Sequence, residues 1–285
     1  MGIDLHQRIK KHLHDLSKGQ KRLANTILVD YDKAAYLTAK ELGDLAGVSE
    51  STVVRFSSEL GFEGYSEFKR AMQELVRIKL TPNQRIEMTK HRIGEGDVLT
   101  SVVESDISKI RYTISKLDRE VFRQSVDAIV GARNLYVLGA RSTEALARLF
   151  SYNLSLIFDN VRFVNPTSST EVFEQMYSVG SEDTVIAFSF PRYSTKVVNA
   201  VRFAKQNSAS VVVFTDSEVS PLCEYSDFVI EAQSDMASYM DSLVAPLSII
   251  NAIVVEITKR RENEIRARFD KLEAIWDEYE VYEKR

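Results

Sequence analysis

Residues 38–62 decide how the first part of this chain folds. They read Thr38-Ala39-Lys40-Glu41-Leu42-Gly43-Asp44-Leu45-Ala46-Gly47-Val48-Ser49-Glu50-Ser51-Thr52-Val53-Val54-Arg55-Phe56-Ser57-Ser58-Glu59-Leu60-Gly61-Phe62. Thr38 and Glu41 have the spacing of a capping box, which predicts the start of a short helix. Gly47 predicts a tight turn, and Ser49 predicts the N-cap of a second helix that runs to about Leu60. Two short helices joined by a glycine turn predict a helix-turn-helix within an all-α N-terminal domain.

The second of these helices has one apolar and one polar face. Val53 and Phe56 fall on the side that packs on the first helix, whereas small hydroxyl side chains and an arginine point outward. Such a face fits a DNA major groove, because Arg reads guanine and Ser or Thr contacts bases or phosphates. We therefore expect operator DNA as a partner, bound by Ser49, Ser51, Thr52, Arg55, Lys21, Arg22 and Lys40. A small helical bundle used only for packing or dimerisation is the alternative interpretation.

The charge of the chain is unevenly distributed. The net charge is −4, but residues 1–80 contain 13 Lys and Arg against 11 Asp and Glu. A local basic surface of this kind is sufficient to contact phosphates. The start of the chain has no apolar segment typical of a secretory signal, and Cys223 is the single cysteine, which excludes an internal disulfide and a cysteine-based zinc site. We expect a cytoplasmic protein with no membrane segment, no metal and no cofactor.

Past residue 131 the pattern changes to short β-rich runs that alternate with helical stretches. This alternation predicts a doubly wound α/β domain with a mostly parallel five-stranded sheet. Its strands are expected at 135–138, 161–164, 184–188, 211–214 and 228–230, and one long helix is expected from Tyr239 to Arg261. The predicted organisation is a DNA-binding domain at 1–79, a linker at 80–96, the α/β domain with its leading helices at 97–262, and an amphipathic helix at 263–285.

The junctions between these strands and the helices that follow are rich in hydroxyl groups. Ligands of parallel sheets bind at this edge, where helix N-termini favour anions. The sequence predicts a pocket for a phosphate or carboxylate, formed by Arg141, Ser142, Thr143, Ser189, Arg192, Ser194 and Thr195. Taken singly, Ser142 and Ser194 can also be explained as ordinary N-caps of helices.

Two stretches of the chain carry a family resemblance. Residues 48–56, together with Leu60-Gly61-Phe62-Glu63-Gly64-Tyr65-Ser66-Glu67-Phe68-Lys69, resemble the DNA-binding domain of the RpiR family of bacterial sugar-responsive regulators. From Asn134 to about Arg261 the pattern resembles the SIS (sugar isomerase) domain that follows in that family. It includes Leu135-Tyr136-Val137-Leu138-Gly139 and Asp183-Thr184-Val185-Ile186-Ala187-Phe188-Ser189. The resemblance implies a regulator with a small anionic, sugar-type effector.

The phosphate loop departs from the pattern of that family, Ser-x-Ser-Gly-x-Thr. Here it reads Ser189-Phe190-Pro191-Arg192-Tyr193-Ser194, so that Arg192 replaces the glycine. Arg141 likewise stands where the first junction of the family often has glycine. Arginine holds phosphate or carboxylate in a bidentate fork, which keeps an anionic ligand as the expectation.

The sequence is also compatible with two other functions. SIS domains also occur in sugar isomerases, but proton transfer between sugar carbons needs a positioned base, often with a histidine. His6, His12, His14 and His91 all precede the α/β domain, so we expect a sensor without catalysis. An SIS scaffold used only for dimerisation is the other alternative. A homodimer or tetramer is expected in any case, because one helix-turn-helix contacts only one half-site.

Overall fold

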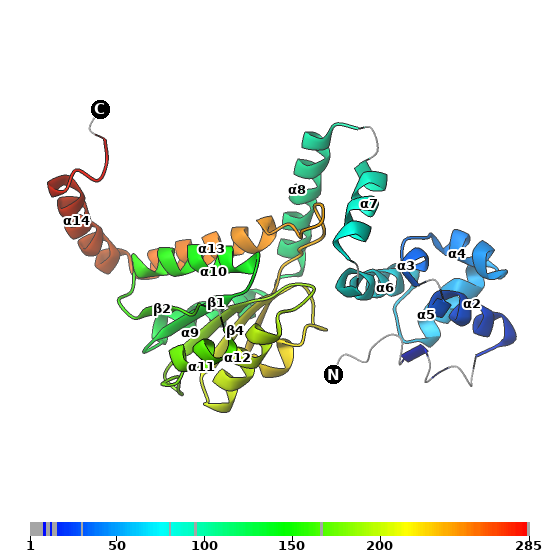
Figure 1. The fold of residues 1–285 in the computed structure, drawn as a ribbon, viewed down its shortest axis with the longest axis horizontal. Helices are drawn as coiled ribbons and strands as arrows, with labels where there is room; N and C mark the ends of the chain where they lie inside the picture. Colours follow the sequence, from blue (N-terminus) through cyan, green and yellow to red (C-terminus); the bar gives the residue numbers. More distant parts are fainter. Residues whose placement is uncertain are drawn as a thin grey trace. The chain divides into compact units, whose positions relative to one another are not determined.

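The computed structural model describes residues 8–9, 12, 16–29, 31–79, 81–93, 96–165 and 168–283. The chain forms two compact units, Met1–Gln84 and Arg85–Arg285. Among the described residues of the first unit, the helices are α2 (Lys18–Val29), α3 (Tyr31–Ala34), α4 (Ala39–Ala46), α5 (Glu50–Glu59) and α6 (Tyr65–Lys79) (Figure 1). The predicted all-α character and helix-turn-helix are confirmed, with α4 and α5 as its two helices.

Local hydrogen bonds fix the ends of α4 and α5. The Thr38 hydroxyl accepts from the backbone N–H of Glu41, whose carboxylate accepts from the N–H of Thr38 at 2.7 Å. Gly47 has φ of 65°, a left-handed conformation that glycine adopts without steric cost. The Ser49 hydroxyl accepts from the N–H of Thr52. The capping box and the second N-cap are therefore where the sequence predicts them.

An aromatic cluster forms the core of the first unit. Phe68 of α6 lies with its ring centroid 5.7 Å from that of Phe56 on α5 and 5.4 Å from that of Phe62, both in edge-on geometry. Such pairs contribute beyond the area that they bury. Every long helix of the unit contributes further fully buried side chains, among them Leu23, Ile27, Leu42, Val53, Met72 and Val76. This core orients α5 with its opposite face toward solvent.

The second unit is an α/β domain. Its described strands are β1 (Leu135–Gly139), β2 (Val161–Phe163), β3 (Thr184–Phe188), β4 (Ser210–Thr215) and β5 (Phe228–Glu231), paired in the order β2-β1-β3-β4-β5. All four pairings are parallel. Helix α7 (Pro82–Ile93) begins in the first unit and continues into the second. The other described helices are α8 (Val98–Lys116), α9 (Arg119–Gly131), α10 (Thr143–Ser155), α11 (Ser169–Gln175), α12 (Thr195–Gln206), α13 (Val244–Arg260) and α14 (Glu262–Glu278), with a 3-10 turn at Cys223–Tyr225. The predicted doubly wound, five-stranded architecture is confirmed.

Helices cover both faces of the sheet (Figure 1). On one face α9, α10 and α13 bury a core with the sheet that includes Phe150, Phe188 and Phe214, and the last two rings stack at 4.5 Å. On the other face α11 and α12 bury Met176 and Val201. The central strands are buried along their whole length on both faces, as expected for a parallel sheet with helices on each side.

A buried carboxylate ties the amino-terminal edge of the sheet together. Asp183, which is 1% exposed, accepts two hydrogen bonds from Arg133, one from the Asn134 amide and one from the N–H of Gly180. Burial opposes ionisation, but these donors outweigh it and hold the pKa of Asp183 below its ordinary value. The ionised carboxylate therefore stabilises the folded state.

Two segments differ from the sequence pattern. Most of the predicted linker, 80–96, is helix α7, and the boundary between the units lies within it, after Gln84. The helix predicted from Tyr239 begins only at Val244. Residues before it form an antiparallel bridge between Met236 and Asp241, and Asp241 accepts from buried Arg85 at 3.0 Å. These tertiary contacts outweigh the local helical pattern. In the described part of the chain, no helix combines the length and apolarity needed to cross a bilayer.

Candidate functional site

The outer face of α5 presents the hydroxyl groups and the arginine predicted for DNA contact. The Ser49 hydroxyl lies 2.9 Å from the hydroxyls of both Ser51 and Thr52. The Arg55 Nε donates to the carbonyl oxygen of Ser51 at 3.3 Å. Ser49, Ser51 and Arg55 are exposed and Thr52 is half-buried. The structure thus brings all four residues together at the amino-terminal part of one helix.

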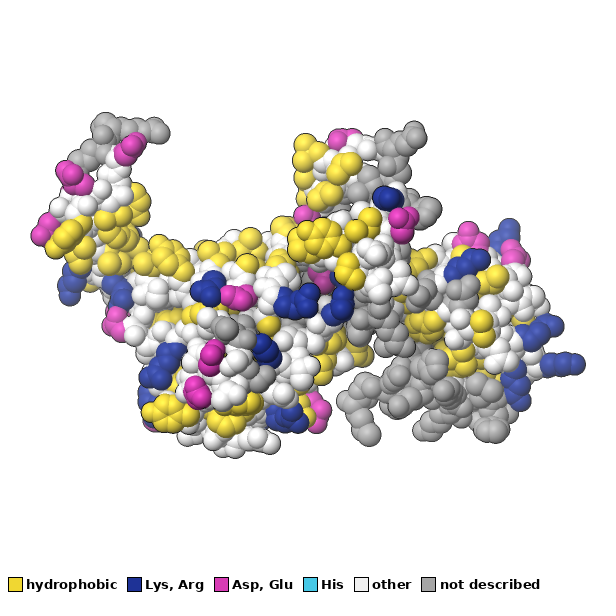
Figure 2. Space-filling view, viewed as in Figure 1, with side chains coloured by type: hydrophobic (Ala, Val, Ile, Leu, Met, Phe, Trp, Pro, Cys, Tyr) yellow, Lys and Arg dark blue, Asp and Glu magenta, His cyan; other side chains and the backbone are white. Residues whose placement is uncertain are grey.

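The three other basic residues predicted to bind DNA come from neighbouring helices. Arg22 of α2 is exposed and donates to the carbonyl oxygen of Gly47 at 2.8 Å, which ties α2 to the turn of the helix-turn-helix. Lys21 is half-buried, and Lys40 is exposed on α4. Lys and Arg side chains stand out from the surface of this unit in Figure 2. Arg22 therefore has a structural contact in addition to its predicted role.

The sequence predicted no role for one exposed residue of α5, Val54. Val54 of α5 is 40% exposed, although the neighbouring Val53 is fully buried. The helical period places it between Ser51 and Ser58, both of which are exposed. Its exposure agrees with the helical period, which places Val53 and Phe56 on the inner side of the helix and leaves Val54 outside that stripe.

A polar cleft lies at the carboxyl edge of the sheet in the second unit. Its volume is about 680 Å³, within the range of small-molecule sites. The side chains that line it follow β1 and β2 or come from the first two turns of α10 and the start of α12: Ala140, Arg141, Glu144, Arg148, Asn165, Ser194, Thr195 and Lys196. Arg141, Ser194 and Thr195 of the predicted ligand site thus meet in one cleft.

The start of α12 is open to an anion. Ser194 is the N-cap residue, but its side chain makes no capping hydrogen bond, and the first turn contains no acidic residue. The amide groups of a helix N-terminus attract negative charge, and Lys196 adds a cation there. The alternative explanation of Ser194 as an ordinary hydrogen-bonded cap does not hold. Ser142 of α10 also makes no capping bond.

The opposite wall of the cleft is an ion pair. Arg148 donates from Nε to Glu144 at 2.8 Å, and its guanidinium carbon lies 4.3 Å from the centroid of the Phe163 ring. These two contacts hold the guanidinium group in place. With Asn165, this wall presents both hydrogen-bond donors and acceptors, which suits hydroxyl groups of a ligand.

The remaining residues of the predicted ligand site do not line the cleft. Thr143 and Ser189 are buried, and their hydroxyl groups are used within the fold. The Thr143 Oγ lies 2.9 Å and 3.0 Å from the carbonyl oxygens of Ala140 and Phe188, and the Ser189 Oγ accepts from the N–H of Ser194. Ser142 and Arg192 are exposed. They are close in sequence to residues of the cleft, but they do not line it.

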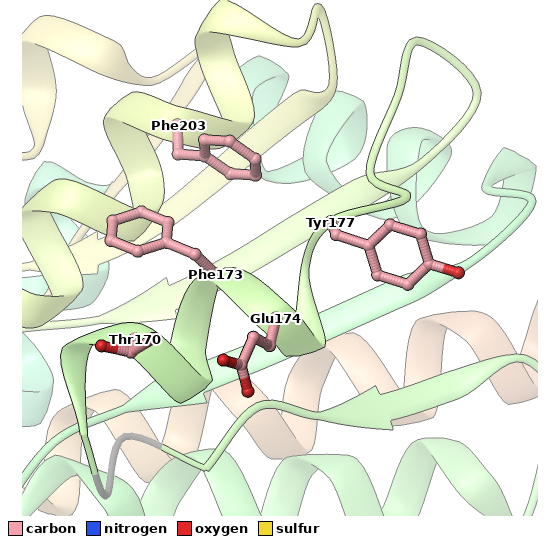
Figure 3. A pocket seen from close by; sticks show the side chains of 5 residues that line it. All are labelled: Thr170, Phe173, Glu174, Tyr177 and Phe203. Atoms are coloured by element: carbon pink, nitrogen blue, oxygen red, sulfur yellow. The ribbon is translucent and has the colours of Figure 1, made fainter.

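A second hollow lies between α11 and α12 (Figure 3). It measures about 500 Å³ and is lined by Thr170, Phe173, Glu174, Tyr177 and Phe203. The rings of Phe173 and Phe203 meet edge to face with their centroids 5.3 Å apart, whereas Glu174 and Tyr177 point in other directions (Figure 3). Its polar groups do not converge, which makes it a poorer ligand site than the cleft. Within the described residues no group of His, Cys, Asp and Glu side chains could hold a metal ion; His6 and His14 lie outside them.

Two family models match the chain. The helix-turn-helix domain of the rpiR family matches residues 3–77, and the SIS domain matches residues 128–256. The chain belongs to the RpiR family. An uncharacterized HTH-type transcriptional regulator of Haemophilus influenzae is 26% identical to this RpiR chain over 254 residues, covering 85% of it and 86% of the relative. The HTH-type transcriptional regulator HexR of Escherichia coli is 24% identical over 279 residues, covering 93% and 91%.

A solved structure of similar fold spans both domains. The Vibrio vulnificus NanR protein complexed with ManNAc-6P has a TM-score of 0.59 and 19% identity, and it covers 95% of the RpiR chain and 97% of its own. At that identity the likeness concerns the fold.

The two arginines that replace family glycines have unusual backbone conformations in this RpiR chain. Arg141 has φ of 60° and Arg192 has φ of 64°, both left-handed. An L-residue other than glycine is strained there by roughly 1–2 kcal/mol. Such strain is concentrated at functional sites, where the surrounding structure maintains it. Glycine would adopt both conformations without strain, so the backbone conformation does not favour arginine at either position.

Proposed function

We propose that this RpiR-family chain is a DNA-binding transcriptional regulator that senses an anionic sugar derivative, in the first instance a sugar phosphate. The observation that carries the proposal is the cleft at the start of α12, with Arg141, Ser194, Thr195 and Lys196 in its lining. These residues supply two cationic side chains and two hydroxyl groups beside a helix N-terminus without a side-chain cap, which are the groups that bind a phosphate. The NanR protein of similar fold, complexed with ManNAc-6P, supports a phosphorylated amino sugar as a candidate class.

In the proposed arrangement, the ligand has a charged end and a neutral end. The phosphate lies against Arg141 and the first turn of α12. The sugar hydroxyls face Glu144, Arg148 and Asn165 on the opposite wall. Arg192, two residues before Ser194 on the same loop, supplies a further cation at the rim. A sugar acid, with a carboxylate in place of the phosphate, is the second ligand class that this arrangement suits.

DNA binding is assigned to the face of α5. Ser49, Ser51, Thr52 and Arg55 enter the major groove, and Lys21, Arg22 and Lys40 contact phosphates on either side. The relatives support this assignment because they are named HTH-type transcriptional regulators. An effector can regulate such binding only by differing in affinity between two states of the protein.

We further propose a homodimer or tetramer as the active form. The amino-terminal half of α8 exposes Val98, Leu99 and Val103, with exposures of 58%, 73% and 46%. Of α14 only Ile265 is fully packed in the chain itself, although Phe269 contacts the core from its rim. These apolar faces are available to a second copy, which would supply the second DNA-reading head. Sedimentation velocity of the full chain at micromolar concentration is expected to give a dimer or larger species, and a monomer would refute this part of the proposal.

The effector assignment is tested by calorimetry of the full chain with N-acetylmannosamine 6-phosphate and related sugar phosphates, each paired with its unphosphorylated sugar. We expect binding of at least one phosphate and none of its neutral partner, together with a change in DNA affinity. Isomerase activity is the alternative. Incubation with each ligand followed by product analysis distinguishes the two, because a sensor returns the ligand unchanged. Binding of no anionic sugar at all would support a scaffold used only for dimerisation.

A further inference from the structure

The cleft at the start of α12 lies where the direction of the chain across the sheet reverses. Helix α10 leads from β1 to β2 on one side, whereas α12 leads from β3 to β4 on the other. Ligands of parallel sheets bind at such switch points. Arg148 of α10 stacks on Phe163 of the edge strand β2, while Lys196 lies in the first turn of α12, after β3. The lining therefore has one end toward β2 and one toward β3.

The charges of these two ends differ. The described residues that line the cleft include three cationic side chains and one carboxylate, a formal net charge of +2: Arg141, Arg148, Lys196 and Glu144. The carboxylate belongs to the β2 end, where Arg148 donates from Nε to Glu144 at 2.8 Å. This pair is formally neutral, so the net charge comes from Arg141 and Lys196. A phosphate monoester carries about −1.5 to −2 at neutral pH, so one phosphate balances the cleft.

The carboxylate of Glu144 limits what Arg148 binds. A guanidinium group held against an aromatic ring would otherwise suit a second anion, because it binds a carboxylate in a bidentate fork. With Glu144 bonded to it, most of this attraction is cancelled, and a ligand carboxylate would lie beside a like charge. The pair still offers donors and an acceptor to neutral hydroxyl groups.

The same ion pair also stabilises α10. Glu144 lies in the first turn, where a carboxylate suits the helix dipole, and it precedes Arg148 by four residues. This structural role predicts an effect on stability. It does not predict that removal of the carboxylate changes which ligands bind, so an experiment separates the two roles.

We propose that Glu144 is a specificity-determining residue that keeps Arg148 paired and so restricts the cleft to ligands with a single anionic group. The effector is then a phosphate ester whose sugar part carries no acid group, or a sugar acid without a phosphate. A phosphorylated sugar acid is disfavoured. This inference rests on the proposed function and narrows its ligand class.

The test compares pairs of ligands by titration calorimetry of the full chain. Glucose 6-phosphate, mannose 6-phosphate and N-acetylmannosamine 6-phosphate are each paired with the acid in which C1 is a carboxylate, such as 6-phosphogluconate. The wild type should bind the sugar phosphate more tightly than its acid. Glu144→Gln should shift the ratio of the two dissociation constants about tenfold toward the acid, the effect of one charge several ångströms away near a protein surface. The acid has an open chain, but this difference in shape cancels when the two proteins are compared.

Two further variants serve as controls. On α13, outside the lining of the cleft, Arg260 donates from Nε to Glu256 at the same 2.8 Å and the same spacing, and the two glutamates are 30% and 33% exposed. Glu256→Gln should therefore leave the ratio unchanged. Glu144→Gln combined with Arg148→Gln should return the ratio to near that of the wild type, because the β2 end is again without net charge.

Three results would overturn the inference. A wild type that prefers the acid would show that the cleft accepts a second anion. An equal effect of Glu144→Gln on both ligands of a pair would leave Glu144 with its structural role alone. A double variant that keeps the shift toward the acid would show that Arg148 is not the group that Glu144 occupies. If the wild type binds no sugar phosphate and no acid, the proposed effector function fails, and this inference fails with it.

Discussion

The left-handed conformation of Arg141 leads to a prediction in which stability and ligand binding change in opposite directions. The perturbation is Arg141→Gly, with Arg141→Ala as its matched control. Both variants remove an exposed guanidinium group that lines the cleft, but only glycine relieves the strain at φ of 60°. The pair therefore separates the role of the backbone from the role of the charge.

The expected magnitudes follow from two opposing effects. Relief of the left-handed backbone is worth roughly 1–2 kcal/mol. The greater freedom of glycine in the unfolded chain costs about 0.5–1 kcal/mol. Arg141→Gly should then be more stable than the wild type by roughly 0.5–1 kcal/mol, whereas Arg141→Ala keeps the strain and should stay close to the wild type. For a domain of this size the gain corresponds to a rise of a few degrees, at about 2–4 °C per kcal/mol.

Ligand binding should respond in the same way to both substitutions. Loss of a hydrogen bond to a charged group is worth about 1.5–3 kcal/mol, so both variants should bind the sugar phosphate roughly 10- to 100-fold more weakly. Scanning calorimetry measures the melting temperature of the α/β unit, and titration calorimetry measures the affinity. If the glycine variant is no more stable than the alanine variant, the argument from strain is wrong. If either variant binds the effector as tightly as the wild type, Arg141 is not part of the site.

Three further predictions concern DNA binding and the fold. Arg55→Ala should lose about 1–3 kcal/mol of specific binding in a gel-shift titration with a selected duplex, and unchanged affinity would mean that α5 is oriented differently in the groove. Lys21→Ala should weaken binding to all duplexes and reduce the slope of log affinity against log salt concentration by about one; an unchanged slope would remove Lys21 from the phosphate contacts. Asp183→Asn should destabilise the α/β unit by about 2–4 kcal/mol in urea unfolding, because it disrupts the buried hydrogen bonds from Arg133 and Asn134. Folding lowers the pKa of the Asp183 carboxyl. Its contribution to stability is therefore complete above the pKa of the unfolded chain, near 4, and is lost as the pH falls through the pKa of the folded state. If Asp183→Asn loses stability in acid just as the wild type does, Asp183 is not the source of that pH dependence.

Much of the helix-turn-helix could be predicted from the sequence because its signals are local. The capping box joins residues three apart, Thr38 and Glu41, and the turn needs only the conformational freedom of Gly47. The strands were predictable for a related reason: a strand buried on both faces is mostly a continuous apolar run, and Val185–Phe188 is one. In the helix-turn-helix the deciding interactions lie within the segment itself. In a buried strand the apolar surroundings on both faces require apolar side chains along most of the segment.

Only the tertiary structure decided which polar side chains face a ligand. Thr143 and Ser194 look alike in the sequence, since each is a hydroxyl residue at a strand-to-helix junction. The Thr143 hydroxyl bonds the carbonyl oxygens at the ends of two neighbouring strands, β1 and β3, whereas the Ser194 side chain makes no capping bond and lines the cleft. The helix predicted from Tyr239 begins at Val244 for the same kind of reason. Asp241 accepts a hydrogen bond from Arg85, which is 156 positions away in the sequence. A local sequence pattern cannot indicate partners that are so distant in the chain. The residues around a hydroxyl or carboxylate are the same whether that group is hydrogen-bonded within the fold or available to a ligand.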